Sequence, residues 1–185
     1  MSRSAVLVMD VQTMVLARIP DPEYLARLRE VIDTARAADI PVIYVVVGFR
    51  PGAPEVSPRN KLFAGVVARL GDADPQATAI PAEVAPRDGD VVVTKRRVSG
   101  FAGSDLDMVL RAQDIDHLVL TGVATSGVVL STLRQAADLD FALTVLADCC
   151  LDRDPEVHRV LTEKVFPSQA DVTTAADWIA AADRT

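Results

Sequence analysis

Three segments of the sequence carry residues that could do chemistry, and each follows an apolar run. Asp10 ends the run AVLVM, Lys95 follows DVVVT, and TGVATSGVVLST begins at Thr121 after HLVL. A carboxylate partly removed from water has a raised pKa, which suits proton transfer. A lysine beside it would pair with it and keep it ionised until substrate arrives. The small residues after Thr121 lead into an apolar helix, whose first N–H groups could hold an anion or oxyanion.

Each of these features also has a structural explanation. Asp10 could cap the element that follows it, and the residues after Thr121 suit an ordinary tight connection. Lys95 opens the basic run KRR, for which a solvated turn is the favoured interpretation when it is considered alone. Arg96 and Arg97 are expected to face solvent or to border the mouth of a substrate site.

Two adjacent cysteines, Cys149 and Cys150, are the only ones in the chain. Neighbouring cysteines rarely form a disulfide with each other, so a reducing compartment is indicated. They follow a predicted strand at 142–147, so one of them could approach the same sheet edge as a nucleophile. Packing of small buried residues is the favoured alternative.

The elements that must position these residues alternate between β-branched runs and amphipathic stretches. Strands are predicted at residues 5–9, 41–47, 90–94, 117–121, 142–147 and 170–173. Helices are predicted at residues 24–38, 61–70, 105–112, 127–139, 155–164 and 175–182, the fifth with Asp152 and Asp154 as candidate caps. This alternation predicts a single domain over residues 1–185, a three-layer α/β/α sandwich with a six-stranded, mostly parallel sheet. Ligands of such sheets bind outside the carboxyl ends of the strands, where Asp10, Lys95 and the segment after Thr121 should converge.

Composition narrows the class of protein. Half of the 185 residues are apolar but only 4% are aromatic, which favours parallel strands buried on both faces. The net charge is −7 and the basic residues are scattered, so no nucleic-acid partner is expected. No apolar run approaches the ~20 residues that span a bilayer, and the start MSRSAVLVMD is too short for a secretory signal. A cytoplasmic protein with no membrane partner is therefore predicted.

The motifs MDVQ, KRRVSGF and TGVATSGVVLSTLRQA, in this order, resemble the isochorismatase-like (cysteine hydrolase) family over nearly the whole chain. The segments FRPG…SPRN and LADCCLDRDPEVH add to the resemblance. It implies a triad of Asp, Lys and Cys, in which Asp10 and Lys95 match the first two. It also implies a cis peptide at Val123–Ala124 and an oxyanion hole from the N–H groups of Ala124 and residue 128.

The cysteine position of that triad holds Val128, which has no nucleophilic atom. Thioester chemistry therefore cannot run through this position. The family's isochorismatases also lack the cysteine and use the aspartate as an acid on a vinyl ether, although they typically carry Tyr where this chain has Ala124. Phe101 resembles a residue that lines the family's substrate pocket, and it could also anchor its loop in the core, since the two roles are compatible. Gly127, at the start of the helix, is expected to contact substrate.

Some amidases of the family hold a metal through an Asp-x-His motif after the second strand. Here that place reads Gly48–Phe49–Arg50, and both histidines, His117 and His158, are interpreted as structural. No metal or other cofactor is expected.

Two hypotheses follow. The first is an isochorismatase-like hydrolase that acts on a small metabolite by acid–base chemistry of Asp10 and Lys95, without a covalent intermediate. The second is a catalytically silent family member that binds a small metabolite or a protein partner. Retention of both charged residues favours the first, and the missing nucleophile favours the second. The resemblance also implies a homo-oligomer, either a dimer or a tetramer.

Overall fold

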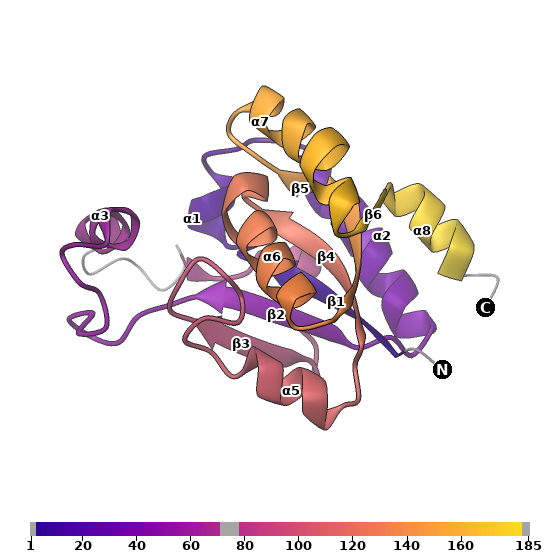
Figure 1. The fold of residues 1–185 in the computed structure, drawn as a ribbon, viewed down its shortest axis with the longest axis horizontal. Helices are drawn as coiled ribbons and strands as arrows, with labels where there is room; N and C mark the ends of the chain where they lie inside the picture. The colour runs from indigo at the N-terminus through magenta and orange to yellow at the C-terminus, as the bar shows by residue number, and fades with distance from the viewer. Residues whose placement is uncertain (1–2, 71–77, 183–185) are drawn as a thin grey trace.

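Six parallel strands form one sheet in the computed structural model, which describes residues 3–70 and 78–182 (Figure 1). They run in the spatial order β3-β2-β1-β4-β5-β6, and every pairing is parallel. The strands are β1 (Ser4–Met9), β2 (Val42–Val47), β3 (Val91–Lys95), β4 (His117–Val123), β5 (Ala142–Leu151) and β6 (Asp171–Thr173). The predicted α/β fold with a six-stranded parallel sheet is confirmed.

Helices cover both faces of this sheet. In the described part of the chain they are α1 (Thr13–Leu16), α2 (Tyr24–Ala37), α3 (Lys61–Leu70), α5 (Leu106–Ala112), α6 (Leu130–Asp138), α7 (Pro155–Val160) and α8 (Ala175–Ala182). Helices α2 and α8 share one apolar core with the sheet, while α5 and α6 share the other. Helix α3 stands apart from the sheet at the end of a long connection (Figure 1).

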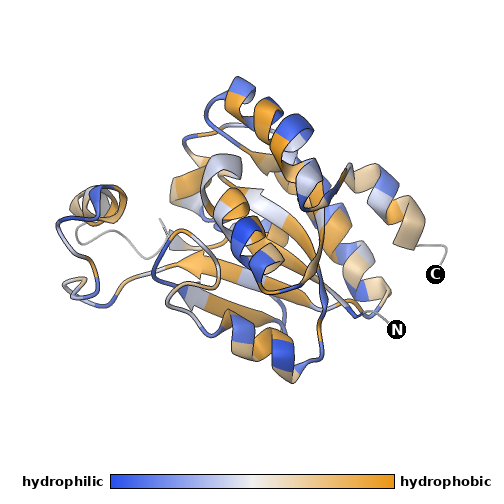
Figure 2. Ribbon diagram, viewed as in Figure 1, coloured by the Kyte–Doolittle hydropathy of each residue, from blue (hydrophilic) through white to orange (hydrophobic). Residues whose placement is uncertain are grey.

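The sheet is buried on both faces because successive strand residues enter different cores. In β1, Ala5, Leu7 and Met9 pack in the core of α5 and α6, whereas Val6 and Val8 pack in that of α2 and α8. All five are almost completely buried. The strands are accordingly hydrophobic along their length, and the outward sides of the helices are more polar (Figure 2). Continuous apolar runs, rather than alternating ones, are what such a sheet requires.

The direction of winding reverses between β1 and β4. The chain adds β2 and β3 on one side of β1, then β4, β5 and β6 on the other, which creates a crevice at the carboxyl ends of the two central strands. Gly122 of β4 lies opposite Met9 with φ +143°, and a Cβ there would come 2.3 Å from the Met9 carbonyl oxygen. Only glycine therefore lets the end of β4 lie this close to the residue before Asp10.

Most predicted boundaries lie within two residues of those in the structure, but three elements differ further in type or length. The predicted helix at 127–139 begins with a π-helical turn, Thr125–Val129, and the one at 155–164 passes into another, Leu161–Val165. Strand β5 continues to Leu151 instead of ending at 147, because its end pairs with that of β4. No helix in residues 3–70 or 78–182 is long and apolar enough to cross a membrane.

Candidate active site

A buried ion pair lies at the carboxyl ends of β1 and β3. The Lys95 Nζ is 2.9 Å from the Asp10 Oδ2 and also donates a 2.9 Å hydrogen bond to the Arg97 carbonyl. Only 2% of the Lys95 side chain is exposed, so the predicted alternative of a solvated turn is wrong for this residue. The lysine reaches past the end of β2, the strand between β1 and β3, to meet the aspartate.

The two oxygens of the Asp10 carboxylate have different surroundings. Oδ2 is paired with Lys95, whereas Oδ1 is buried and has no hydrogen-bond partner among the described residues. Burial raises the pKa of Asp10 to about 6, and the nearby Lys95 charge opposes part of this rise. A carboxyl group with a pKa this close to neutrality can both give and take a proton at physiological pH.

Asp10 and Lys95 open onto a mainly apolar cavity of about 320 Å³. Its walls come from α1, α3, the ends of β1, β2 and β3, and the turn after β4. The lining residues are Asp10, Met14, Val15, Arg18, Val47, Leu62, Phe63, Val66, Lys95, Val98, Ala124, Gly127 and Val128. The cavity has room for a small metabolite and offers it three charged groups in an apolar surrounding.

The turn after β4 also forms part of the cavity wall. The Val123–Ala124 peptide is cis, and Ala124, Gly127 and Val128 all line the cavity. The structure therefore brings together five of the six sequence-predicted site residues. Val128, at the place of the family's cysteine, is only 2% exposed and presents an apolar surface.

Phe101, the sixth, is not among the residues that line this cavity. Its side chain packs in the core of α5 and α6, with its ring centroid 5.9 Å from that of Phe141. The segment around it is tied to α6, because Ser99 donates a hydrogen bond to Gln135 and Gly100 N–H donates one to Thr132. Phe101 thus anchors the loop after β3, and its predicted contact with substrate finds no support in its position.

Sequence reasoning missed two side chains that hold the turn after β4. The buried Thr125 hydroxyl hydrogen-bonds to His158 Nδ1 at 2.8 Å, and Ser126 N–H donates a 2.7 Å hydrogen bond to Asp152. Burial lowers the pKa of His158. Of the two predicted caps, Asp154 caps α7, whereas Asp152 serves the turn. Separations of 26 and 33 residues leave no local sequence signal for these contacts.

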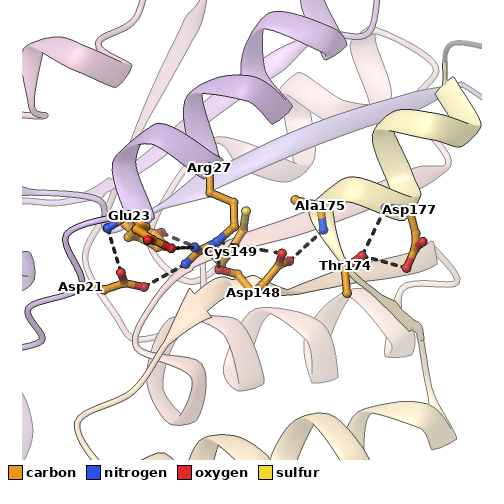
Figure 3. A network of polar contacts seen from close by, with 9 residues as sticks. Asp21, Glu23, Arg27, Asp148, Cys149, Thr174, Ala175 and Asp177 are labelled. Atoms are coloured by element: carbon orange, nitrogen blue, oxygen red, sulfur yellow. Dashed lines mark hydrogen bonds and ion pairs between the residues drawn. The ribbon is translucent and has the colours of Figure 1, made fainter.

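The two cysteines lie inside β5, and neither lines the cavity. Cys149 faces the core of α2 and α8, and Cys150 faces that of α5 and α6. Figure 3 shows Cys149 beside a polar network in which Arg27 donates to the Asp148 carbonyl and pairs with Asp21, while Asp148 accepts from Ala175 N–H. Burial raises the pKa of the Cys149 thiol to about 12 and raises that of Cys150 as well. A substitute nucleophile is not supported.

Both thiols are therefore expected to resist alkylation in the folded protein, since the thiolate is the reactive form. Iodoacetamide at pH 8 should leave Cys149 and Cys150 unlabelled under native conditions and label both after unfolding in urea, as read by mass spectrometry. Any turnover should survive the native treatment. Inactivation that Cys150→Ser prevents would instead make Cys150 the nucleophile.

The histidines do not gather with other metal-binding side chains. His117 hydrogen-bonds to Ser4 and Thr144 at the beginning of β4, far from the carboxyl edge. In the described ranges, no three His, Cys, Asp or Glu residues lie close enough to hold a metal ion together.

A doubly wound parallel sheet with a buried acid–lysine pair in a cavity at its switch point is the architecture of a small-molecule α/β enzyme. Residues 4–177 match the isochorismatase domain, and the chain belongs to the isochorismatase family. It is 34% identical to the ureidoacrylate amidohydrolase RutB of Stutzerimonas stutzeri over 178 residues, covering 86% of this chain and 67% of the relative.

Solved structures agree with this assignment. A cysteine hydrolase from Pseudomonas syringae pv. phaseolicola superposes with a TM-score of 0.88 at 26% identity, covering 98% of this chain and 93% of the other. An N-carbamoylsarcosine amidase from Thermoplasma acidophilum gives 0.74 at 29% identity, covering 94% and 96%. The prediction of an isochorismatase-like hydrolase is confirmed at the level of the family.

Proposed function

We propose that the protein hydrolyses a small anionic metabolite by acid–base chemistry of Asp10, without a covalent enzyme intermediate. One observation carries the proposal: the unpaired Oδ1 belongs to a buried carboxyl group that lines the cavity, while the nucleophile position in the same cavity holds Val128. Asp10 would donate a proton to the substrate, water would add to the carbon activated in this way, and the proton that the water releases would return to Asp10 as the bond breaks. Lys95 would hold the carboxyl group in place and restore its charge balance after transfer.

The anionic class of substrate rests on the charges of the cavity. Asp10 and Lys95 neutralise each other, which leaves Arg18 as the uncompensated charge on the wall. The Arg18 guanidinium has no hydrogen-bond or ion-pair partner in the described part of the chain. Guanidinium groups bind carboxylates through two parallel hydrogen bonds. Two relatives are named for ureidoacrylate and N-carbamoylsarcosine, and acrylate and sarcosine are both carboxylic acids.

A substrate screen tests the proposal directly. Vinyl ethers, small amides and ureido compounds, each as a carboxylate and as its neutral amide or ester, are offered to wild type and to Asp10→Asn. Turnover of at least one carboxylate by wild type, lost in the variant, supports the hydrolase. If wild type turns over nothing and both proteins bind the same ligands equally well, the protein is a binding module.

The predicted homo-oligomer, a dimer or a tetramer, stays a prediction.

Arg18→Gln should raise the KM for a carboxylate substrate by about tenfold or more, because a charge-assisted hydrogen bond is lost. The kcat should change much less, since Arg18 does not touch the ion pair that transfers the proton. Arg111→Gln, which removes an exposed arginine from α5, is the matched control and should behave as wild type. An equal rise in KM for the neutral analogue would contradict carboxylate binding by Arg18.

A further inference from the structure

Three arginines converge on a second hollow, outside the cavity of Asp10 and Lys95. This hollow has a volume of about 460 Å³ and is lined by Arg50, Glu55, Arg96, Arg97 and Gly103. Its walls are the connection from β2 to α3 and the segment that follows β3. Gly103 has φ +71°, and a Cβ there would come 3.0 Å from the Arg96 Cβ, so glycine lets the segment after β3 fold back on itself.

The positive charges in this hollow exceed the negative ones. Glu55 is the single acid, with its Oε1 3.5 Å from Arg50 Nη1 and 3.2 Å from Arg96 Nε. Among the described residues, the Arg97 guanidinium donates only to backbone carbonyls, those of Arg96 and Glu55, at 2.7 and 2.9 Å. Three guanidinium groups against one carboxylate leave two positive charges uncompensated, in a chain whose net charge is −7. Like charges that line one hollow repel one another, and Glu55 relieves this repulsion for Arg50 and Arg96.

We propose that the hollow binds a small doubly charged oxyanion of the phosphate type, either inorganic phosphate or the terminal group of a phosphate monoester. Planar guanidinium groups match the oxygens of such an anion in geometry and in charge. A monocarboxylate carries one charge too few to neutralise the cluster. This ligand is separate from the substrate proposed above, and its binding requires no catalytic activity.

The hollow is connected to the ion pair in two ways. The carbonyl of Arg97 accepts the hydrogen bond from Lys95 Nζ, and the guanidinium of Arg97 holds the β2–α3 connection through the Glu55 carbonyl. That connection also carries Phe49, which packs edge-on against Phe63 of α3 at 5.6 Å between ring centroids. Phe63 lines the cavity of Asp10. An anion that fixes the position of Arg97 would therefore also reduce the motion of Lys95 and of the part of the Asp10 cavity wall that α3 forms.

Titration calorimetry at constant ionic strength tests the binding. Phosphate should bind saturably, with a Kd below about 1 mM. Arg50→Gln and Arg97→Gln should each weaken it about tenfold or more. The Arg50 side chain is 64% exposed, so its replacement should not disturb folding. Arg50→Gln therefore still tests the site if the Arg97→Gln variant does not fold. Arg159→Gln, on α7, is the matched control. Methyl phosphate, offered in parallel, separates a monoester from the free ion.

Hydrogen exchange in the phosphate complex tests the connection. Protection should increase in peptides covering residues 48–60 and 96–103 and stay constant in β5 and α8. Binding that does not saturate, or that Arg50→Gln leaves unchanged, would show an adventitious ion only and overturn the site. Saturable binding with no change in protection would refute the link to Lys95, and neither result depends on the hydrolase having a known substrate.

Discussion

Asp10→Asn is expected to lower turnover by about 10²–10⁴-fold, the range that general acid–base catalysis contributes. Asparagine keeps the shape of the side chain but cannot transfer a proton. Among the residues that line the cavity, Asp10 is the one carboxyl group, and Lys95 is already committed to it and to the Arg97 carbonyl. No other group on the wall is placed to replace the lost proton donor. Steady-state kinetics with a substrate from the screen measures the loss.

Asp114→Asn is the matched control for this variant. Asp114 has φ +54°, as Asp10 does, and lies exposed after α5. Asparagine tolerates this left-handed backbone conformation, so neither substitution should strain the chain. Thermal unfolding of both variants separates a catalytic loss from a folding defect, which the unpaired Lys95 could otherwise cause. A folded Asp10→Asn protein that keeps more than a tenth of wild-type turnover would refute the role of Asp10.

The pH dependence of kcat/KM should reveal the ionisation of Asp10. The raised pKa of Asp10, about 6, means that the carboxyl group is mostly protonated below pH 6 and mostly ionised above it. If Asp10 acts as the acid, kcat/KM should be level below about pH 6 and fall tenfold per pH unit above it. A fall on the acidic side would assign Asp10 as a base instead. A profile with no bend near pH 6 would exclude Asp10 from proton transfer.

The strands and their parallel pairing were predictable because parallel strands buried on both faces must be continuously apolar, whereas their order in space was not predicted. The same rule indicates where Asp10 and Lys95 meet, since residues that follow parallel strands share one edge of the sheet. Strand β5 was predicted too short because its end, ADCCL, contains a charged residue that suggests a loop. In the structure the Asp148 carboxylate pairs with Arg27 and accepts a hydrogen bond from the first N–H of α8. Both partners are distant in sequence, so no local pattern predicts these contacts.

The rest of the site depends on contacts between distant segments. Arg18 lies on the chain just after the four-residue helix α1, which is too short to show a helical period, so nothing local places it in the cavity. The position of Asp152 just before α7 predicts a helix cap. In the structure Asp152 instead accepts a hydrogen bond from Ser126 N–H in the turn after β4. For Phe101 the sequence leaves two roles open, lining the pocket and anchoring its loop in the core, and its position in the core agrees with the second.

Val128→Cys is expected to add a new activity rather than improve the native reaction. Val128 lines the cavity in the turn that leads into α6, where helix N–H groups lower the pKa of a thiol. Asp10 and Lys95 line the same cavity, and the cis Val123–Ala124 peptide already shapes the turn. Cysteine is close to valine in volume, so the fold should tolerate it. The variant should hydrolyse small amides that wild type does not, through an acyl intermediate on the new sulfur.

Two comparisons decide whether this amidase activity comes from the introduced thiol. Val128→Ala, which changes the packing but supplies no nucleophile, should leave small amides untouched. Combining Val128→Cys with Asp10→Asn should abolish the new activity, because the thiol then lacks the group that takes its proton. Iodoacetamide should label the introduced thiol under native conditions and stop amide hydrolysis, while Cys149 and Cys150 stay unlabelled in the core. Amide hydrolysis by Val128→Ala equal to that of Val128→Cys would show that the added sulfur takes no part, and that the wall at position 128 restricts only which substrates enter.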